Sequence, residues 1–275
     1  MAMLRLSLVS FLSIVALGAV VTAQTPDDRA WSDFLQWLKS APPANGPLEI
    51  LNGYRAAVQS RGLPAADSDR QLTTVMRLMR DRTDAWSLIF DNIYTSRTPN
   101  FSTAPSPLLM AAIEGRTPGR ALDVGMGQGR NAVALAKRGW DVTGIDISDE
   151  GLAVAKANAT IAGVSLKAVR ASDGQFDYGR EQWDLIAFVY GPGSTANDAF
   201  VQRLHDALKP GGIVVVESFA SPASAVRRRP VDIDPADLLR AFAKFRLLRF
   251  EDADGVSEWD PQTTSLVRMV AQKRP

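Results

Sequence analysis

The chain has 275 residues, 46% of them hydrophobic, and its 31 Lys and Arg nearly balance its 30 Asp and Glu at a net charge of +1. This is enough for one large domain, or one domain with an appendage, and the charge gives no argument for a nucleic-acid or anionic-membrane partner. The absence of cysteine excludes a disulfide framework, a cysteine nucleophile and thiolate metal ligands. A single histidine, His205, excludes a multi-histidine metal site, so we predict no metal and interpret His205 as a surface or packing residue.

Residues 1–24 have the pattern of a secretory signal peptide. Arg5 precedes an uncharged apolar stretch over 6–21, and small residues lead to a cleavage position after Ala23. The stretch is somewhat short for a spanning helix, although membrane anchoring through residues 4–23 is the alternative. We expect an exported protein, periplasmic or secreted, or one that is membrane-anchored by this segment. The sequence leaves a cytoplasmic location open.

Residues 25–106 are predicted to form a helical cap followed by a linker. Apolar residues recur at helical spacing in four segments, which begin at Trp31, Leu48, Leu72 and Trp86. We interpret these apolar faces as the core of the cap rather than as part of a cofactor site. The stretch 95–107 is rich in Pro, Ser and Thr and is expected to be a linker or loop.

Strand and helix patterns alternate over residues 107–275. The predicted strands are 120–124, 141–145, 166–170, 183–190, 212–219, 245–251 and 265–271. The predicted helices are 107–114, 131–138, 149–162, 196–208 and 235–244. Such alternation indicates an α/β fold, a doubly wound and mostly parallel sheet covered by helices on both faces. The last two strands, joined by a loop at Asp254-Gly255, are predicted to close the sheet as an antiparallel pair.

Three alternating glycines follow the first predicted strand. Gly125, Gly127 and Gly129 would let the backbone turn tightly and let a ligand approach it closely. In a doubly wound sheet, ligands lie outside the carboxyl ends of the strands, and this turn is such a place. The dinucleotide fingerprint would require its third glycine one residue later, where the chain has Arg130.

Two carboxylates follow the next predicted strands. Asp146 ends the second strand, where it could accept hydrogen bonds from the vicinal hydroxyls of a ribose. Asp173, followed by Gly174, ends the third strand, where it could accept from an exocyclic amine. Either aspartate could instead be a helix cap or a turn residue.

Residues 120–217 resemble class I S-adenosylmethionine-dependent methyltransferases. ALDVGMGQGRN is similar to the first motif of that family, VTGIDIS to the second-strand motif and ASDGQF to the adenine-side motif. WDLIAFVY and LKPGGIVVVE resemble the fourth-strand and fifth-strand motifs. The GRN segment and the residues after it are especially similar to the small-molecule branch with tellurite-resistance and ubiquinone-type enzymes. The resemblance covers about residues 107–274, without the cap or the signal-like segment.

The resemblance implies a Rossmann-like, seven-stranded sheet, S-adenosyl-L-methionine as cofactor, and in-line transfer of a methyl group to an unidentified small-molecule acceptor. It places Asp123 and the three glycines at the methionine end, Asp146 at the ribose, and Ile147 and Asp173 near the adenine. Tyr190, at the end of the fourth strand, is the candidate catalytic contact. The cofactor-binding residues that it implies are Asp123, Gly125, Gly127, Gly129, Asn131, Asp146, Ile147, Asp173, Gly174 and Phe188.

Other interpretations stay open at this point. One is a nicotinamide-dependent oxidoreductase, against which the glycine spacing counts, and another is a non-catalytic exported binding module with the same fold. No general base is evident, and no Asn-Pro-Pro-Tyr run of amino-methylating nucleic-acid enzymes is present, which favours an intrinsically nucleophilic or small acceptor. We expect no nucleic-acid partner. The basic run Arg227 to Arg229 is interpreted as a solvated loop. The sequence does not assign an oligomeric state.

Overall fold

A computed structural model describes residues 24–79, 81–221, 232–258 and 263–274. The signal-like segment up to residue 23 and the run Arg227 to Arg229 lie outside the described residues, so the expectations for them stay predictions. Within the described ranges, no helix is both long enough and apolar enough to span a membrane.

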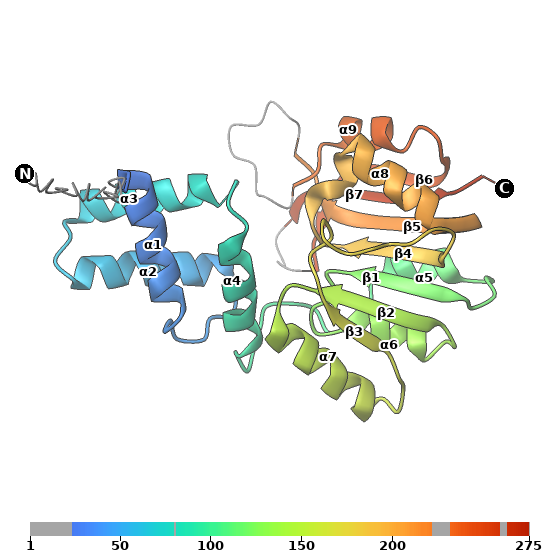
Figure 1. Cartoon of the computed structure of the whole chain (residues 1–275), viewed down its shortest axis with the longest axis horizontal. Coiled ribbons are helices and arrows are strands. Elements are labelled where there is room, and N and C mark those ends of the chain that lie inside the picture. The colour runs from blue at the N-terminus through green and yellow to red at the C-terminus, as the bar shows by residue number, and fades with distance from the viewer. Residues whose placement is uncertain (1–23, 80, 222–231, 259–262, 275) are drawn as a thin grey trace, which may run out of the picture.

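In the described part of the chain, the first four helices pack into a lobe beside the sheet (Figure 1). A proline in the first turn of two of them costs no hydrogen bond, since amides there have no partner within the helix. The Thr25 hydroxyl caps the first helix by accepting from the Asp28 amide. The helices share an apolar core built around Phe34, Tyr54 and Ile89, which confirms the four helical segments. They are α1 (Pro26–Leu38), α2 (Pro47–Ser60), α3 (Ala65–Leu78) and α4 (Asp84–Tyr94).

The sheet has seven strands in the order β3-β2-β1-β4-β5-β7-β6. Its first five strands are parallel, and β7 runs antiparallel to both of its neighbours. The doubly wound sheet with an antiparallel end is therefore confirmed. The strands are β1 (Arg120–Val124), β2 (Asp141–Asp146), β3 (Lys167–Arg170), β4 (Trp183–Val189), β5 (Leu208–Phe219), β6 (Arg246–Val256) and β7 (Thr263–Gln272).

Helices cover both faces of the sheet (Figure 1). The central strands β1, β4 and β5 are buried almost throughout, as expected for parallel strands with near-continuous apolar runs. One face packs against α8 (Asp198–Ala207) and α9 (Pro235–Ala241). The other packs against α5 (Pro107–Ile113), α6 (Arg130–Ala136) and α7 (Asp149–Ile161). A single 3-10 turn over Gly193–Ala196 leads into α8.

The prediction of a loop at Asp254-Gly255 was wrong. Both residues lie inside β6, where Asp254 pairs with Ser265 and Gly255 pairs with Thr264 of β7. The Ser265 hydroxyl also donates to the Asp254 carboxylate at 2.7 Å. The local turn tendency of Asp-Gly is overridden here by a continuing antiparallel ladder. The chain reversal therefore falls after Val256.

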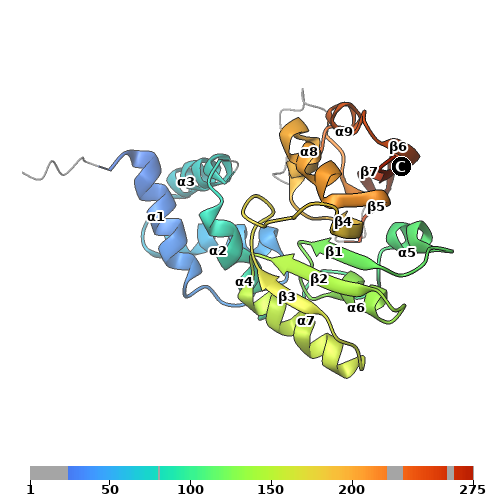
Figure 2. The same ribbon diagram turned by 45° about the vertical axis from the view of Figure 1, so that its right-hand side comes forward.

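The last helix of the lobe joins it to the sheet. Helix α4 lies against α7, close to the end of β2, in both ribbon views (Figure 2). The Asp91 carboxylate on α4 accepts from the Ser148 hydroxyl at 2.7 Å and from the Glu150 amide at 3.2 Å. These two groups belong to the first turn of α7, so the lobe is attached directly beside the carboxyl end of the sheet.

Candidate functional site

A cavity of about 490 Å³ lies between the helical lobe and the carboxyl ends of the parallel strands. This volume falls within the range of about 300–1,000 Å³ that small-molecule sites occupy. Its position outside the carboxyl ends of β1 to β4 is where doubly wound sheets bind ligands. In the described part of the chain it is lined by Met79, Thr83, Trp86, Ser87, Phe90, Tyr94, Val124, Gly125, Ile145, Asp146, Ile147, Arg170, Ala171, Ser172, Asp173, Gln175, Tyr190, Gly191 and Pro192.

The alternating glycines have two different roles. Gly125, with φ of 72°, lines the cavity, and a Cβ atom there would lie 3.3 Å from the Cα of Gly191. Gly129, with φ of 78°, is the residue directly before α6, and a Cβ atom would lie 2.8 Å from the Cβ of Ala155 on α7. The left-handed backbone and the close approach both require glycine. The first glycine thus serves the cavity wall, and the third serves the packing of α6 on α7.

Asp146 is the acidic group at the end of β2. It lines the cavity and is 8% exposed. The amides of Gly127 and Ser148 donate to its two oxygens at 2.8 and 2.9 Å. Burial raises the pKa of this carboxyl, while these amides favour the anion and oppose the rise. Since a carboxylate has about four lone-pair positions, acceptor positions remain for the hydroxyls of a ligand in the cavity.

Asp173 lines the same cavity beyond the end of β3. Its Oδ1 accepts from the Gly174 amide at 2.9 Å, and its Oδ2 accepts from the Ser194 hydroxyl. The second contact joins the β3 loop to the turn that follows β4. Gly174 itself is exposed, and it is not among the described residues that line the cavity. The carboxylate, rather than the glycine, therefore faces the site.

Tyr190 follows β4 with a φ of 53°, an uncommon angle for a bulky residue. Its amide donates to the Glu217 carbonyl at 2.7 Å, and its ring packs 5.2 Å from the ring of Phe219. The Glu258 amide donates to its hydroxyl at 3.4 Å. Burial, followed by the charge of Glu217, raises the pKa of this hydroxyl. The hydroxyl therefore stays neutral near pH 7, and Tyr190, which lines the cavity, is unsuited to act as a base there.

Asp123 lies in β1, next to the cavity-lining Val124, and does not itself line the cavity. It is 1% exposed, and its Oδ2 has no hydrogen-bond partner among the described residues. Burial raises the pKa of this carboxyl to about 7, and the charge of Arg130 and the Ala132 amide limit the rise. A buried acceptor without a partner is costly, so this group favours a nearby positive charge or donor.

The structure brings only part of the predicted site together at the cavity. Gly125, Asp146, Ile147, Asp173 and Tyr190 line it. The other residues lie behind this wall or away from it, and their assignment as cofactor contacts stays a prediction. They are Asp123, Gly127, Gly129, Asn131, Gly174 and Phe188. Among the described residues, no group of three or more His, Asp or Glu side chains could hold a metal ion.

Two of these residues have clear structural roles instead. Phe188 is 2% exposed and packs edge-on against Phe200 of α8, with ring centroids 5.9 Å apart. The buried Asn131 side chain accepts from the Ser106 amide at 2.9 Å and so holds the linker. His205, as expected, is a packing residue, with its ring 5.3 Å from the ring of Phe245.

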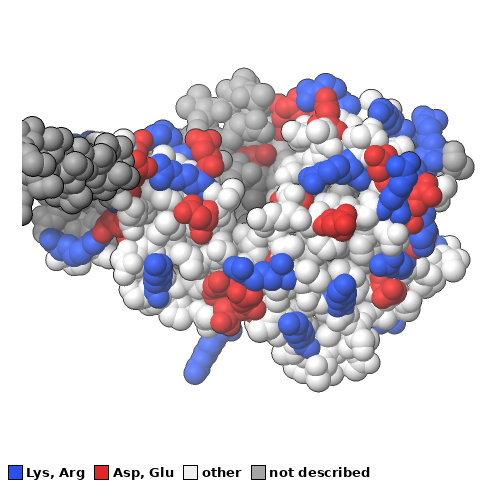
Figure 3. Space-filling view, viewed as in Figure 1, with Lys and Arg blue, Asp and Glu red and all other residues white. Residues whose placement is uncertain are grey.

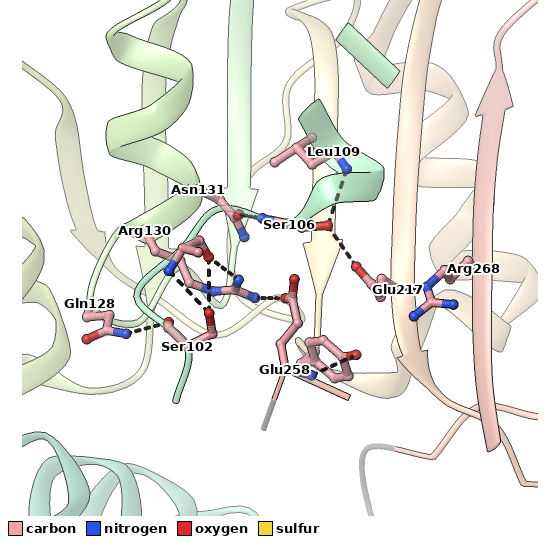
Figure 4. Close-up of polar contacts among 11 residues, drawn as sticks. Ser102, Ser106, Leu109, Gln128, Arg130, Asn131, Glu217, Glu258 and Arg268 are labelled. Carbon is pink, nitrogen blue, oxygen red and sulfur yellow. Dashed lines mark hydrogen bonds and ion pairs between the residues drawn. The ribbon is translucent and has the colours of Figure 1, made fainter. Parts of the chain in front are cut away.

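A polar cluster ties the linker to the carboxyl end of β5 (Figure 4). The Ser106 hydroxyl donates to Glu217 at 2.7 Å, and Arg268 of β7 donates to the other oxygen of this carboxylate at 2.7 Å. On the same side, Arg130 pairs with Glu258. These mostly buried ion pairs tie the linker, the start of α6 and the β6–β7 hairpin together. The linker is therefore a fixed part of the site's surroundings rather than a loose connection.

Sequence reasoning missed the aromatic wall of the cavity. Trp86, Phe90 and Tyr94 line it from α4, at spacings of four residues. Ile89 and Ile93 of the same helix lie in the core of the lobe, as predicted. Trp86 and Phe90 also pack against this core, so the interpretation of the stripe as core was right but missed their second contact with the cavity. The separate i, i+4, i+8 repeat of large aromatics was the signal that could have shown a second apolar face.

Comparison with known proteins supports a family assignment. Residues 121–212 match the model of a family described as a methyltransferase domain. The ubiquinone biosynthesis O-methyltransferase of Shewanella halifaxensis is 35% identical over 97 residues, which cover 34% of this chain and 41% of that protein. The putative methyltransferase YqeM of Bacillus subtilis is 31% identical over 111 residues, covering 38% and 43%. The chain thus spans less than half the length of these curated relatives.

Solved structures show the same fold. TehB from Haemophilus influenzae superposes with a TM-score of 0.52 at 16% identity, covering 68% of this chain and 67% of TehB. A SAM-dependent methyltransferase from Methanosarcina mazei gives a TM-score of 0.51 at 16% identity, covering 62% and 99%. At this identity the likeness concerns the fold alone. Together with the sheet order, the comparisons show that residues 121–212 match a methyltransferase domain and that the sheet has the fold of S-adenosylmethionine-dependent methyltransferases.

The residues at the cavity fit S-adenosylmethionine, the cofactor that this likeness implies. Asp146 has acceptor positions for vicinal hydroxyls, and Asp173 presents a carboxylate beside the β3 end. Gly125 has no side chain, and a Cβ atom there would approach Gly191 and Pro192 on the opposite side of the cavity lining. The unpartnered oxygen of Asp123 suits a cationic group above β1. The nicotinamide interpretation is not favoured by these matches.

Proposed function

We propose that this chain is an S-adenosylmethionine-dependent methyltransferase that acts on a small-molecule acceptor. The observation that carries the proposal is the cavity at the carboxyl end of the sheet, where Gly125, Asp146 and Asp173 from three successive strand ends meet. The family match over residues 121–212 and the O-methyltransferase relatives support the same reaction class.

The bound cofactor would supply an activated methyl group on a sulfonium. The task of the chain is then to hold and align the reactants, which can lower the barrier by several kcal/mol. Asp146 would hold the ribose, and Asp173 would face the adenine edge. Gly125 and the Gly191-Pro192 turn would border the methionine portion. In this arrangement the chain binds, orients and excludes water rather than forming a covalent intermediate.

The acceptor would approach at the end of β4. Tyr190 lines the cavity there, and its neutral hydroxyl can donate a hydrogen bond to an acceptor oxygen. The described lining residues near β4 include no carboxylate or imidazole that would take a proton. We therefore propose an acceptor that is already nucleophilic near neutral pH, such as an acidic hydroxyl or a thiol in its anionic form.

A nucleic-acid substrate does not fit the proposal. On the face seen in Figure 3, acidic and basic side chains of the described residues are intermixed rather than gathered by sign. Extended phosphate backbones are bound by continuous basic surfaces.

We also propose export or membrane anchoring through residues 4–23, which N-terminal sequencing of protein from fractionated cells would test. Since S-adenosylmethionine is made in the cytoplasm, an exported enzyme would need a supply of cofactor.

Isothermal titration calorimetry with purified residues 25–275 tests the reaction class. We expect saturable binding of S-adenosylmethionine and none of NAD. In Asp146→Ala the affinity should fall about 10- to 100-fold, because the ribose hydroxyls lose a charged acceptor worth about 1.5–3 kcal/mol. Binding of NAD alone would replace the proposal with the oxidoreductase interpretation. If the folded protein binds neither, the non-catalytic interpretation takes its place.

A further inference from the structure

Helix α4 lies outside the residues that match the methyltransferase family, yet it forms one side of the cavity. Its isoleucines are buried in the lobe, whereas Trp86, Phe90 and Tyr94 line the cavity opposite the strand ends. Neighbouring rings along this row are 5.8 and 6.5 Å apart and tilted by only 30° and 29°. The helix therefore presents a continuous row of aromatic surface to the space where Asp146 and Asp173 meet.

Tyr94 contacts the glycine-rich turn directly. A Cβ atom on Gly127 would overlap the Tyr94 hydroxyl oxygen, and one on Gly151 would lie 2.9 Å from its ring. Both positions must therefore be glycine for the tyrosine to fit between the turn and α7. The sequence motif explains Gly127 by the cofactor alone, but the structure adds a side chain from the lobe that needs the same space.

The Tyr94 hydroxyl has a proton to donate. The Gln128 amide donates to this oxygen, and burial together with the charge of Asp146 raises its pKa, so it stays neutral. A hydroxyl that accepts from an amide keeps its own hydrogen for a further acceptor. Tyr94 lines the cavity, and an oxygen of a bound ligand would be such an acceptor.

Asp91 fixes the position of this helix. Its contacts with the Ser148 hydroxyl and the Glu150 amide attach α4 to the turn that directly follows Asp146 and Ile147. Asp91 does not line the cavity among the described residues, so it can act only through the placement of α4 and of this turn. It is a positioning residue.

We propose that α4 completes the cofactor site from outside the methyltransferase domain. Tyr94 contacts the cofactor through its hydroxyl, Trp86 and Phe90 form the wall against its planar purine, and Asp91 holds the helix in place. This inference rests on the proposed function, since it names further residues for the same ligand. The competing explanation is that these residues only pack the lobe onto the sheet.

The test is binding of S-adenosylhomocysteine to single variants of residues 25–275, measured by calorimetry, with thermal unfolding as a parallel measurement. Tyr94→Phe removes one hydroxyl and keeps the ring, so we expect affinity to fall about 3- to 10-fold, with the unfolding midpoint lowered no further than in the control variant. Tyr54→Phe is the matched control. It removes the hydroxyl that donates to Asp33 at 2.8 Å inside the lobe and should leave affinity unchanged.

Two further variants separate contact from packing. Adding the ligand should quench the fluorescence of wild type, and Trp86→Phe should lose most of that change although the other five tryptophans remain. Asp91→Ala should weaken binding about 3- to 10-fold, while Asp91→Asn, which keeps an acceptor oxygen for the Ser148 hydroxyl, should restore most of the affinity.

The outcomes distinguish the two proposals. If wild type binds neither S-adenosylhomocysteine nor S-adenosylmethionine, the proposed function fails and this inference fails with it. If wild type binds but Tyr94→Phe and Trp86→Phe match it in affinity and in quenching, only the inference is overturned. It is also overturned if affinity falls in Tyr54→Phe as much as in Tyr94→Phe, since that would indicate a general effect of loosening the lobe.

Discussion

Replacing Asp123 by asparagine should change how the stability of the protein depends on pH. The carboxyl is 1% exposed, one of its oxygens lacks a partner among the described residues, and burial raises its pKa to about 7. The unfolded chain has an ordinary aspartate with a pKa of about 3.9. Between these values the folded state holds a proton that the unfolded state has released, so the free energy of unfolding falls as pH rises.

The size of the effect follows from the same shift. One proton difference changes the free energy of unfolding by up to about 1.4 kcal/mol per pH unit, over about 3 units, and the change levels off above about pH 7. The loss for wild type is therefore at most about 4 kcal/mol. The asparagine side chain is neutral and nearly isosteric with aspartate, so the variant should be similar to wild type at pH 4 and more stable at pH 8.

Urea unfolding followed by circular dichroism at pH 5, 6, 7 and 8 would measure this difference. Because the variant keeps every other ionisable group, its own pH dependence is the background to subtract. We expect the stability of Asp123→Asn to rise relative to wild type from pH 5 to pH 7 and then to stay constant. Parallel pH profiles for the two proteins would refute the assignment of a buried, proton-binding carboxyl at this position.

Three further predictions concern stability and binding. Gly129→Ala should lower the free energy of unfolding by about 2–4 kcal/mol, because the added Cβ atom overlaps Ala155 and the backbone is left-handed. Gly115→Ala is the control, since Gly115 has a φ of 70° and open space around it. In the same urea titration it should lose only about 1–2 kcal/mol. Arg268→Ala should cost about 3–5 kcal/mol, because the buried Glu217 charge keeps its hydrogen bond from Ser106 but loses its positively charged partner. An equal loss in a surface variant such as Arg70→Ala would contradict this. His205→Gln should leave cofactor affinity in calorimetry unchanged, since this side chain extends from α8 to pack against Phe245 and does not line the cavity, and a tenfold loss would show a role in the site.

The fold was predictable because its signals are local. Apolar runs of five to seven residues, separated by helical periodicity, specified the parallel strands and their alternation with helices. The prediction was wrong at Asp254-Gly255, where a turn dipeptide lies inside a strand because its partner strand continues the ladder. Local tendency is a weak guide wherever long-range pairing supplies the hydrogen bonds.

Part of the candidate site was predictable for a geometric reason. The carboxyl ends of parallel strands meet at one edge of a sheet, so Gly125, Asp146 and Asp173 could be placed together from their positions after successive strands. Position after a strand did not distinguish the motif residues that line the cavity from the motif residues that face the protein interior. Phe188 and Asn131 follow the same motifs but face the core and the linker.

The sequence by itself determined the order of strands and helices along the chain, the glycine-rich turn, and the acids that end β2 and follow β3. These features depend on residues that are neighbours in the sequence. Only the tertiary structure decided that the aromatic face of α4 closes the cavity and that Tyr94 lies on Gly127. Helical periodicity shows that a face is apolar, but it does not show which surface will cover it. That choice is made when segments distant along the chain pack together, here through the contact of Asp91 with the start of α7.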